Sequence, residues 1–278
     1  MSSKVKARPT TKRRARKTVA NVQTVLDLRP RTHGGSRVGA GRKRDQGKHD
    51  PDHRTRPPLV PRHPMHVVLR TLPKVGRLRR REVFVAARRE MRRAADRAAA
   101  LAGVTNPGLN VKLPFRVVHI SIQHNHVHLL VEADSSTALS AGMQRLTIAL
   151  ARAVNRSLGR KGKVFAYRYH RTDITSPRQA RSALAYVLNN WRRHRENETT
   201  VGAQNATLDP YSTAVLFQGW RGARFVIPTN YVPLPVSQPT TWLLSVGWRK
   251  HGEIDPLTPP GPLWTRTRRK MLQVAQGQ

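Results

Sequence analysis

Hydrophobic and polar positions alternate in three short segments of the first half of the chain. They are residues 65–71 (MHVVLRT), 115–122 (FRVVHISI) and 126–132 (HVHLLVE), and the first is also rich in β-branched side chains. This pattern predicts strands, because successive side chains of a strand point to opposite faces. Only residues 123–125 separate the last two segments, so we expect them to pair as an antiparallel hairpin.

Three longer segments have apolar residues at the three- and four-residue spacing of amphipathic helices. They are residues 77–101, 138–158 and 177–194. The third has the clearest start, because Ser176 suits an N-cap, Pro177 the first helical position and Gln179 a capping box. The apolar stripes predicted for the other two helices are Phe84, Ala87, Met91, Ala94, Ala98 and Leu101, and Leu139, Met143, Leu146, Leu150 and Val154.

A short extended segment at residues 164–168 lies between the second and third helices. The predicted order is therefore strand, helix, strand, strand, helix, short strand, helix. An antiparallel β-sheet with helices packed on it, an α+β fold, is the arrangement that this order favours.

Composition divides the chain into three parts. Residues 1–62 are rich in Arg, Lys, Pro and Gly and poor in bulky apolar side chains, so they cannot offset the entropy of ordering. We predict that they form a disordered basic tail. Residues 63–198 carry the periodic patterns and form the predicted folded domain. Residues 199–278 are Pro-rich with scattered Trp and Arg, and we expect an irregular C-terminal extension.

The net charge indicates a polyanionic partner. Lys and Arg number 52 against 15 Asp and Glu, which gives a formal charge of +37. Aromatic residues make up only 5%, and the chain has no obvious stripe of aromatic or Leu anchors opposite Lys and Arg, no long apolar run and no secretory signal to indicate a membrane. The absence of cysteine excludes disulfides, zinc ribbons and thiol catalysis. We expect a cytoplasmic, nucleoid-associated protein that acts on nucleic acid.

Several basic side chains are candidates for contacts with phosphate. A Gly-Arg cluster at residues 34–44 resembles arms that follow the phosphate backbone or enter a minor groove. The alternative is a solvated tail that only raises non-specific affinity. The candidate DNA-binding residues are Arg37, Arg42, Lys43, Arg44, Arg145, Arg152, Arg156 and Arg168.

A histidine pair in the third strand is a candidate metal site. His126 and His128 flank Val127, so both imidazoles point to the same face of the sheet. Two neutral imidazoles with further oxygen ligands suit Mn²⁺ or Mg²⁺, and less specifically Zn²⁺. A purely structural pair of histidines is the alternative.

The third helix adds a candidate nucleophile. Tyr186 and Asn190 are four residues apart and share a face of the helix, at the margin of its apolar stripe. A tyrosine hydroxyl attacks a phosphodiester only when the phosphate is polarised or the pKa of the phenol is lowered. An ion held by the histidines would polarise the phosphate, and Asn190 would add an oxygen ligand. A core tyrosine and a solvated or capping asparagine are the alternatives.

These segments resemble the Y1 HUH transposases, and in particular the branch of REP-associated tyrosine transposases. In that family two histidines flank an apolar residue in the metal-binding strand, and a helical Tyr is followed four residues later by an amide residue. The resemblance covers roughly residues 63–196. It rests on the order and spacing of residues 123–131, 143–146, 151–156, 162–170 and 185–190.

The resemblance implies a ferredoxin-like HUH endonuclease fold and a mechanism. His126, His128 and Asn190 would hold a divalent ion, Mg²⁺ or Mn²⁺, on the scissile phosphate. Tyr186 would attack and leave a 5′-phosphotyrosine link and a free 3′-hydroxyl, and reversal on another 3′-hydroxyl would join strands. The implied substrate is single-stranded DNA near hairpins of repetitive palindromic elements, bound by a monomer or homodimer.

Two other functions are compatible with the pattern. A domesticated, catalytically silent descendant would bind DNA or RNA hairpins without cutting them, although all four proposed site residues are present. A generic basic RNA-binding module would need an aromatic platform on the sheet, and neither residues 115–122 nor 126–132 supply one.

Overall fold

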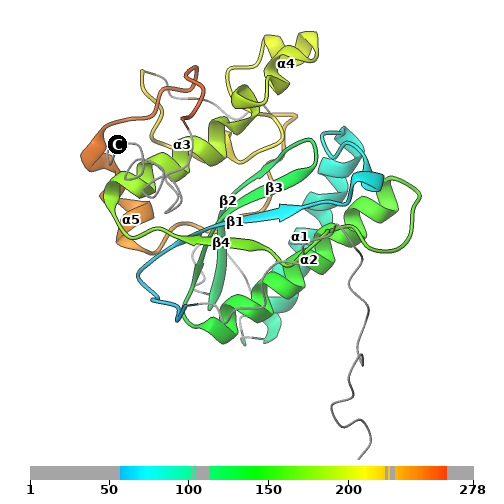
Figure 1. Cartoon of the computed structure of the whole chain (residues 1–278), viewed down its shortest axis with the longest axis horizontal. Helices are drawn as coiled ribbons and strands as arrows, with labels where there is room; N and C mark the ends of the chain where they lie inside the picture. Colours follow the sequence, from blue (N-terminus) through cyan, green and yellow to red (C-terminus); the bar gives the residue numbers. More distant parts are fainter. Residues whose placement is uncertain (1–56, 102, 104–112, 223–224, 226–228, 262–278) are drawn as a thin grey trace, which may run out of the picture. The chain divides into compact units, whose positions relative to one another are not determined.

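Four strands form one antiparallel sheet in the order β2-β3-β1-β4 (Figure 1). The computed structural model describes residues 57–101, 103, 113–222, 225 and 229–261. The strands are β1 (Met65–Arg70), β2 (Phe115–Ile122), β3 (His126–Ala133) and β4 (His170–Asp173). β2 and β3 form the expected hairpin, and β1 pairs with β3 on one side and with β4 on the other.

Three long helices accompany the sheet: α1 (Arg81–Leu101), α2 (Ser136–Ser157) and α3 (Pro177–Arg193). The chain order β1-α1-β2-β3-α2-β4 with β3 between β1 and β2 is the split β-α-β arrangement of ferredoxin-like folds. The α+β fold predicted from the sequence is therefore confirmed. The shorter helical elements are η1 (Pro73–Val75), η2 (Glu196–Glu198), α4 (Val201–Gln204), η3 (Ala214–Leu216), α5 (Trp242–Ser245) and η4 (Gly247–His251).

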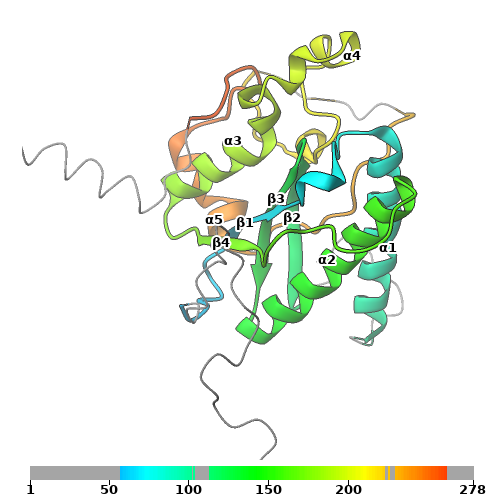
Figure 2. The same cartoon turned by 45° about the vertical axis from the view of Figure 1, so that its right-hand side comes forward.

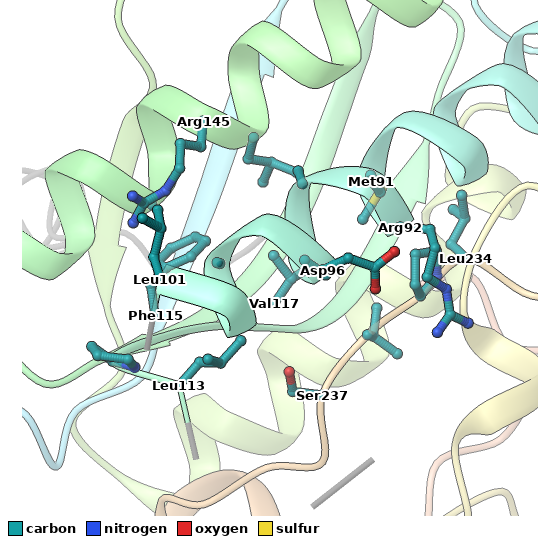
Figure 3. A pocket seen from close by; sticks show the side chains of 18 of the residues that line it. Met91, Arg92, Asp96, Leu101, Leu113, Phe115, Val117, Arg145, Leu234 and Ser237 are labelled. Carbon is teal, nitrogen blue, oxygen red and sulfur yellow. The ribbon is translucent and has the colours of Figure 1, made fainter. Parts of the chain in front are cut away.

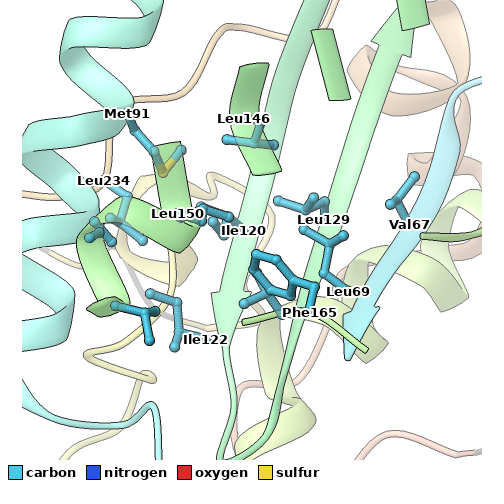
Figure 4. Close-up of a cluster of buried hydrophobic side chains, with 14 of the residues drawn as sticks. Val67, Leu69, Met91, Ile120, Ile122, Leu129, Leu146, Leu150, Phe165 and Leu234 are labelled. Atoms are coloured by element: carbon cyan, nitrogen blue, oxygen red, sulfur yellow. The ribbon is translucent and has the colours of Figure 1, made fainter. Parts of the chain in front are cut away.

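One face of the sheet packs on α1 and α2 (Figure 4). Val67 and Leu129 are register partners on β1 and β3, and both are fully buried there together with Ile120 of β2. Met143 and Leu150 of α2 cover them. These are the apolar side chains at alternate strand positions that point toward α1 and α2. They belong to the larger of the two clusters of buried hydrophobic side chains among the described residues.

The opposite face of the sheet packs on α3 (Figure 2). Leu130 of β3 and Val118 of β2 are buried against Leu184 and Leu188 of the helix. Val118 lies at an irregularity in the β2–β3 register, where a bulge turns it toward this side. α3 therefore seats its apolar stripe on the same face of the sheet that carries the histidines.

The described chain after residue 199 completes the α3 core. It holds only short helical turns, as the predicted irregular extension would, but its apolar side chains are buried against α3. The contributing residues are Ala214, Phe217, Trp220, Leu243, Leu244, Trp248 and Ile254. The division of the chain at residues 62/63 and 198/199 stays a prediction.

Two predicted elements differ from the structure. The short strand is not at residues 164–168, where only Phe165 forms an isolated bridge, with Thr71; it is β4, at residues 170–173. β4 is an edge strand with the sequence HRTD, so it lacks an apolar signal. Of the apolar stripe predicted for α1, Phe84, Ala87 and Met91 are buried. Leu101, at the end of the helix, is 79% exposed.

Helix α3 starts where the sequence predicted. Ser176 is the N-cap, and its hydroxyl accepts a hydrogen bond from the Gln179 backbone N–H. The Gln179 side chain reaches back one residue further than a capping box requires, because its Oε1 accepts from the N–H and hydroxyl of Thr175. This cap fixes the start of the helix that carries Tyr186.

The basic residues Arg37, Arg42, Lys43 and Arg44 lie outside the described residues. Among the described helices, none is long and apolar enough to cross a membrane.

Candidate active site between the sheet and helix α3

The site starts from three histidines on one face of the sheet. His126 and His128 alternate with buried Val127 in β3, so their rings lie on the α3 side. Because Val68 of β1 is the register partner of His128, His66 lies on the same face one strand away. His128 and His66 are buried, at 4% and 3% exposed, whereas His126 is partly open to solvent.

Tyr186 projects from α3 onto these histidines. Its ring meets the His128 ring edge to face with centroids 5.3 Å apart, and it meets the His66 ring in the same way at 5.9 Å. The rings of His126 and His128 are also edge to face, with centroids 4.6 Å apart. Tyr186 is half-buried, and its ring contacts the histidines.

Asn190 lies on α3 between two residues that contact the histidines of the sheet. Residues 186, 190 and 194 follow one another at four-residue steps and therefore share a face of the helix. Tyr186 contacts His128, and the His194 ring lies 5.3 Å from that of His126. Asn190, between them, is fully buried. The structure thus brings all four predicted site residues to one interface.

Hydrogen bonds define which nitrogen of each histidine is free. His126 Nδ1 lies 2.8 Å from Asn125 Oδ1, a carbonyl oxygen that only accepts, so Nδ1 carries the proton and Nε2 has a free lone pair. His128 Nδ1 lies 2.9 Å from His66 Nε2. In each of the two histidines, the ring nitrogen without a hydrogen bond is Nε2. The two histidines would therefore bind one shared ion through their Nε2 atoms.

Three buried polar atoms at this interface have no hydrogen-bond partner among the described residues. They are Nε2 of His128 and both Oδ1 and Nδ2 of Asn190. Buried polar groups are nearly always paired, because an unpaired one loses its hydration without compensation. A ring nitrogen and an amide oxygen are the kinds of atom that coordinate a bound cation.

Burial keeps the histidines neutral. Desolvation, helped by neighbouring His194, lowers the pKa of His126 to about 4. Desolvation also lowers the pKa of His66 to about 3, and it lowers the pKa of His128 well below its usual range. A neutral imidazole is the form that binds a metal ion, so no proton has to leave at physiological pH.

The donor set fits a divalent ion but is small. Among the described residues, no group of three or more His, Asp or Glu side chains is arranged to hold a metal. The candidate set is instead two imidazole nitrogens, of His126 and His128, and one amide oxygen, of Asn190. Imidazole with oxygen ligands suits first-row ions such as Mn²⁺. Three protein ligands also leave positions open for a substrate oxygen.

The predicted DNA-binding arginines of α2 lie away from this site. α2 covers the other face of the sheet, so the sheet separates Arg145 and Arg152 from Tyr186 (Figure 2). Both side chains are exposed, whereas Arg156 is held by an ion pair with Glu90 of α1. Arg168 is exposed in the connection that leads to β4.

A cavity of about 840 Å³ is also on the α1–α2 side (Figure 3). It lies between α1, α2 and residues 232–237, and its lining includes Met91, Phe115 and Arg145. It contains none of the predicted catalytic or metal-binding residues, so it is not part of the site.

Sequence reasoning missed two neighbours of Tyr186. His66 was visible only as a polar position in the first strand, and the β1–β3 register is needed to place it beside His128. Arg193 holds its guanidinium carbon 5.8 Å from the centre of the Tyr186 ring, while its Nη1 donates to the Pro260 carbonyl. The arginine run after Tyr186 signals charge in the sequence but not this contact.

The structure combines a ferredoxin-like sheet with a histidine pair that faces a helical tyrosine. Comparison with known proteins identifies a matching family for part of this chain. Residues 79–190 match the family described as transposase IS200 like, which confirms the family resemblance in that segment. The matched segment contains His126, His128, Tyr186 and Asn190. Comparison with curated proteins found no match.

One solved structure similar to this chain is described as a REP-associated tyrosine transposase bound to a REP hairpin. The TM-score is 0.36 and the identity 12%, over 51% of this chain and 74% of the other.

Proposed function

We propose that this protein cuts and rejoins single-stranded DNA next to hairpins through Tyr186, with the help of a divalent ion. One observation carries the proposal: the Tyr186 ring lies against His128, whose Nε2 is buried without a partner at the interface that also buries the unpaired amide of Asn190. If the histidines only supported the fold, nothing would require the buried polar atoms of His128 and Asn190 to be left without partners.

The chemistry requires an in-line displacement at phosphorus. The Tyr186 Oη would lose its proton and form a bond to the phosphorus while the bond from phosphorus to the 3′-oxygen breaks, and the 3′-oxygen would take up a proton and leave as a hydroxyl, so that no proton is consumed overall. When bound by His126, His128 and Asn190, a divalent ion, Mn²⁺ or Mg²⁺, supplies positive charge that polarises the phosphate. The link between Tyr186 and the 5′-phosphate keeps the energy of the bond, so rejoining needs no nucleotide cofactor.

The other side chains of the site have supporting roles in this proposal. Arg193, whose guanidinium carbon lies 5.8 Å from the centre of the Tyr186 ring, supplies positive charge beside the bound phosphate. The net charge of +37 favours binding of the strand, because contacts with phosphate dominate affinity for nucleic acid. Hairpin DNA as the substrate comes from the family resemblance.

Detection of a covalent adduct tests the proposal. The full-length chain is incubated with Mn²⁺ and labelled single-stranded hairpins from repeats flanking its own gene, and the products are separated on a denaturing protein gel. We expect a labelled adduct that is absent in Tyr186→Phe and present in Tyr167→Phe. Tyr167 is the matched control, since it is an exposed tyrosine outside the site.

The other outcomes separate the alternatives. Cleavage without an adduct would indicate attack by water and contradict the tyrosine mechanism. Tight hairpin binding with neither adduct nor cleavage, with both Mn²⁺ and Mg²⁺, would instead support a domesticated hairpin-binding protein.

A further inference from the structure

His66 and His128 share one hydrogen bond and therefore one proton. His66 Nε2 and His128 Nδ1 lie 2.9 Å apart, and both side chains are buried. The planes of the two rings are 20° apart and their centroids 5.1 Å apart. His66 also contacts Tyr186, so it belongs to the same site although its strand lies outside the segment that matches the transposase family.

The position of that proton decides what His128 can bind. If His66 donates, His128 carries its own proton on Nε2, which is then a buried donor with no partner among the described residues. If His128 donates from Nδ1, its Nε2 has a free lone pair. Only the second arrangement allows His128 to bind a cation, and His66 then accepts at Nε2 and keeps its own proton on Nδ1.

We propose that His66 is a positioning residue that accepts the Nδ1 proton of His128 and so holds His128 Nε2 free to bind the divalent ion. The inference rests on the proposed function for the identity of the ligand, but the position of the proton is a property of this chain alone. His126 has the same arrangement by a local route, because the Asn125 carbonyl oxygen accepts from its Nδ1. Both imidazoles are thus held through Nδ1 and present Nε2.

The geometry also sets the orientation of the rings. The hydrogen bond with His66 on a neighbouring strand helps to fix the orientation of the His128 ring. Because Tyr186 lies against both rings, His66 helps to set the distance between the nucleophile and the ligand nitrogen. Loss of such outer partners typically lowers metal affinity about 10- to 100-fold.

Two substitutions of His66 separate hydrogen bonding from packing. His66→Gln keeps an oxygen that accepts from His128 Nδ1, whereas His66→Leu fills the space without an acceptor. His119→Leu is the matched control: it removes another buried histidine of the sheet, whose hydrogen bond and ring contact are with Thr213 and Phe217. Circular dichroism on each full-length variant confirms folding.

Mn²⁺ affinity, measured by isothermal titration calorimetry without DNA, is the first readout. We expect His66→Leu to bind Mn²⁺ about 10- to 100-fold more weakly than the wild type. His66→Gln should recover most of the affinity, and His119→Leu should bind as the wild type does. Equal affinity of the wild type and His66→Leu would overturn the proposal.

The proton itself is observed by ¹⁵N NMR of the histidine side chains in the metal-free wild-type protein. We expect the His128 proton on Nδ1; a proton on Nε2 would overturn the inference. This measurement needs no variant and no activity. If the wild type neither binds Mn²⁺ nor forms an adduct, the proposed function fails, and the NMR result still decides the role of His66.

Discussion

His128 and Tyr186 meet edge to face at 5.3 Å between ring centroids, and the two residues come from β3 and α3, elements separated by a helix and a strand in the chain. The contact joins the candidate ligand to the candidate nucleophile. It depends on the side of the sheet on which α3 packs, and that side is set by buried Leu130 and Val118 beside the histidines.

The histidine pair should be needed for cleavage but not for most of the binding. We expect His126→Ala with His128→Ala to abolish adduct formation while the affinity for hairpin DNA falls only a few-fold, because charged contacts elsewhere supply most of that affinity. Electrophoretic mobility shift and adduct gels on the same samples measure the two effects. Equal loss of binding and cleavage would contradict a metal-binding role.

Asn190 should oppose stability while it serves the site. Its amide is fully buried with no partner for either polar atom among the described residues, and each such group costs about 1–3 kcal/mol. We therefore expect Asn190→Leu, which has the same number and branching of side-chain heavy atoms, to raise the metal-free melting temperature by roughly 2–4 °C per kcal/mol recovered. The same variant should bind Mn²⁺ more weakly. A lower melting temperature would show that the amide has a partner in solution.

Much of this arrangement was predictable from the sequence, and the exceptions share a cause. Period-2 and period-3.6 patterns located β1, β2, β3 and all three long helices, because each of those elements has an apolar face. β4 has none, so its position was predicted wrongly. His126, His128, Tyr186 and Asn190 were found because their spacing along a strand or a helix is local.

The parts that were missed depend on contacts between distant residues. His66 reaches His128 only through the β1–β3 register, which no local spacing encodes. Likewise, Trp220 and Trp248 follow no periodic pattern in a Pro-rich segment, yet both are buried against α3. Local periodicity therefore predicted the ligands and the nucleophile, but not the residues that hold them.

A buried ion pair should tie the late part of the chain to the start of α1. Arg79 and Asp209 form a two-point contact, with nitrogen–oxygen distances of 2.8 and 3.0 Å, and Arg79 also donates to the Ile122 carbonyl. Asp209→Ala removes both contacts with the Asp209 carboxylate and, among the described carboxylates, leaves the buried guanidinium only the longer contact of its Nε with Glu196, at 3.5 Å, so it should lower the free energy of unfolding by about 3 kcal/mol. Urea denaturation measures this loss. Exposed Asp96→Ala is the control and should change little.

His119 should contribute a defined pH dependence to stability. Burial lowers its pKa from 6.5 to about 4, so the unfolded chain binds a proton between these values that the folded chain does not. Stability from this residue is complete above pH 6.5 and is lost as the pH falls toward 4, by on the order of 3 kcal/mol. We expect His119→Gln, whose amide can still donate to Thr213, to flatten the plot of the free energy of unfolding against pH between pH 4 and 6.5. Identical slopes for variant and wild type would contradict the shift.

The exposed arginines of α2 should affect binding without affecting the chemical step. Arg145 and Arg152 lie across the sheet from Tyr186, so they can contact the flanks of a DNA substrate but not the scissile phosphate. If each contacts one phosphate, replacing both with Ala should lower the slope of log affinity against log salt concentration by about 1.4 on a single strand. The rate of adduct formation at saturating DNA should stay unchanged. A slower rate at saturating DNA would place these arginines at the reacting phosphate and would contradict their position on α2. An unchanged salt slope would show that α2 faces away from the DNA.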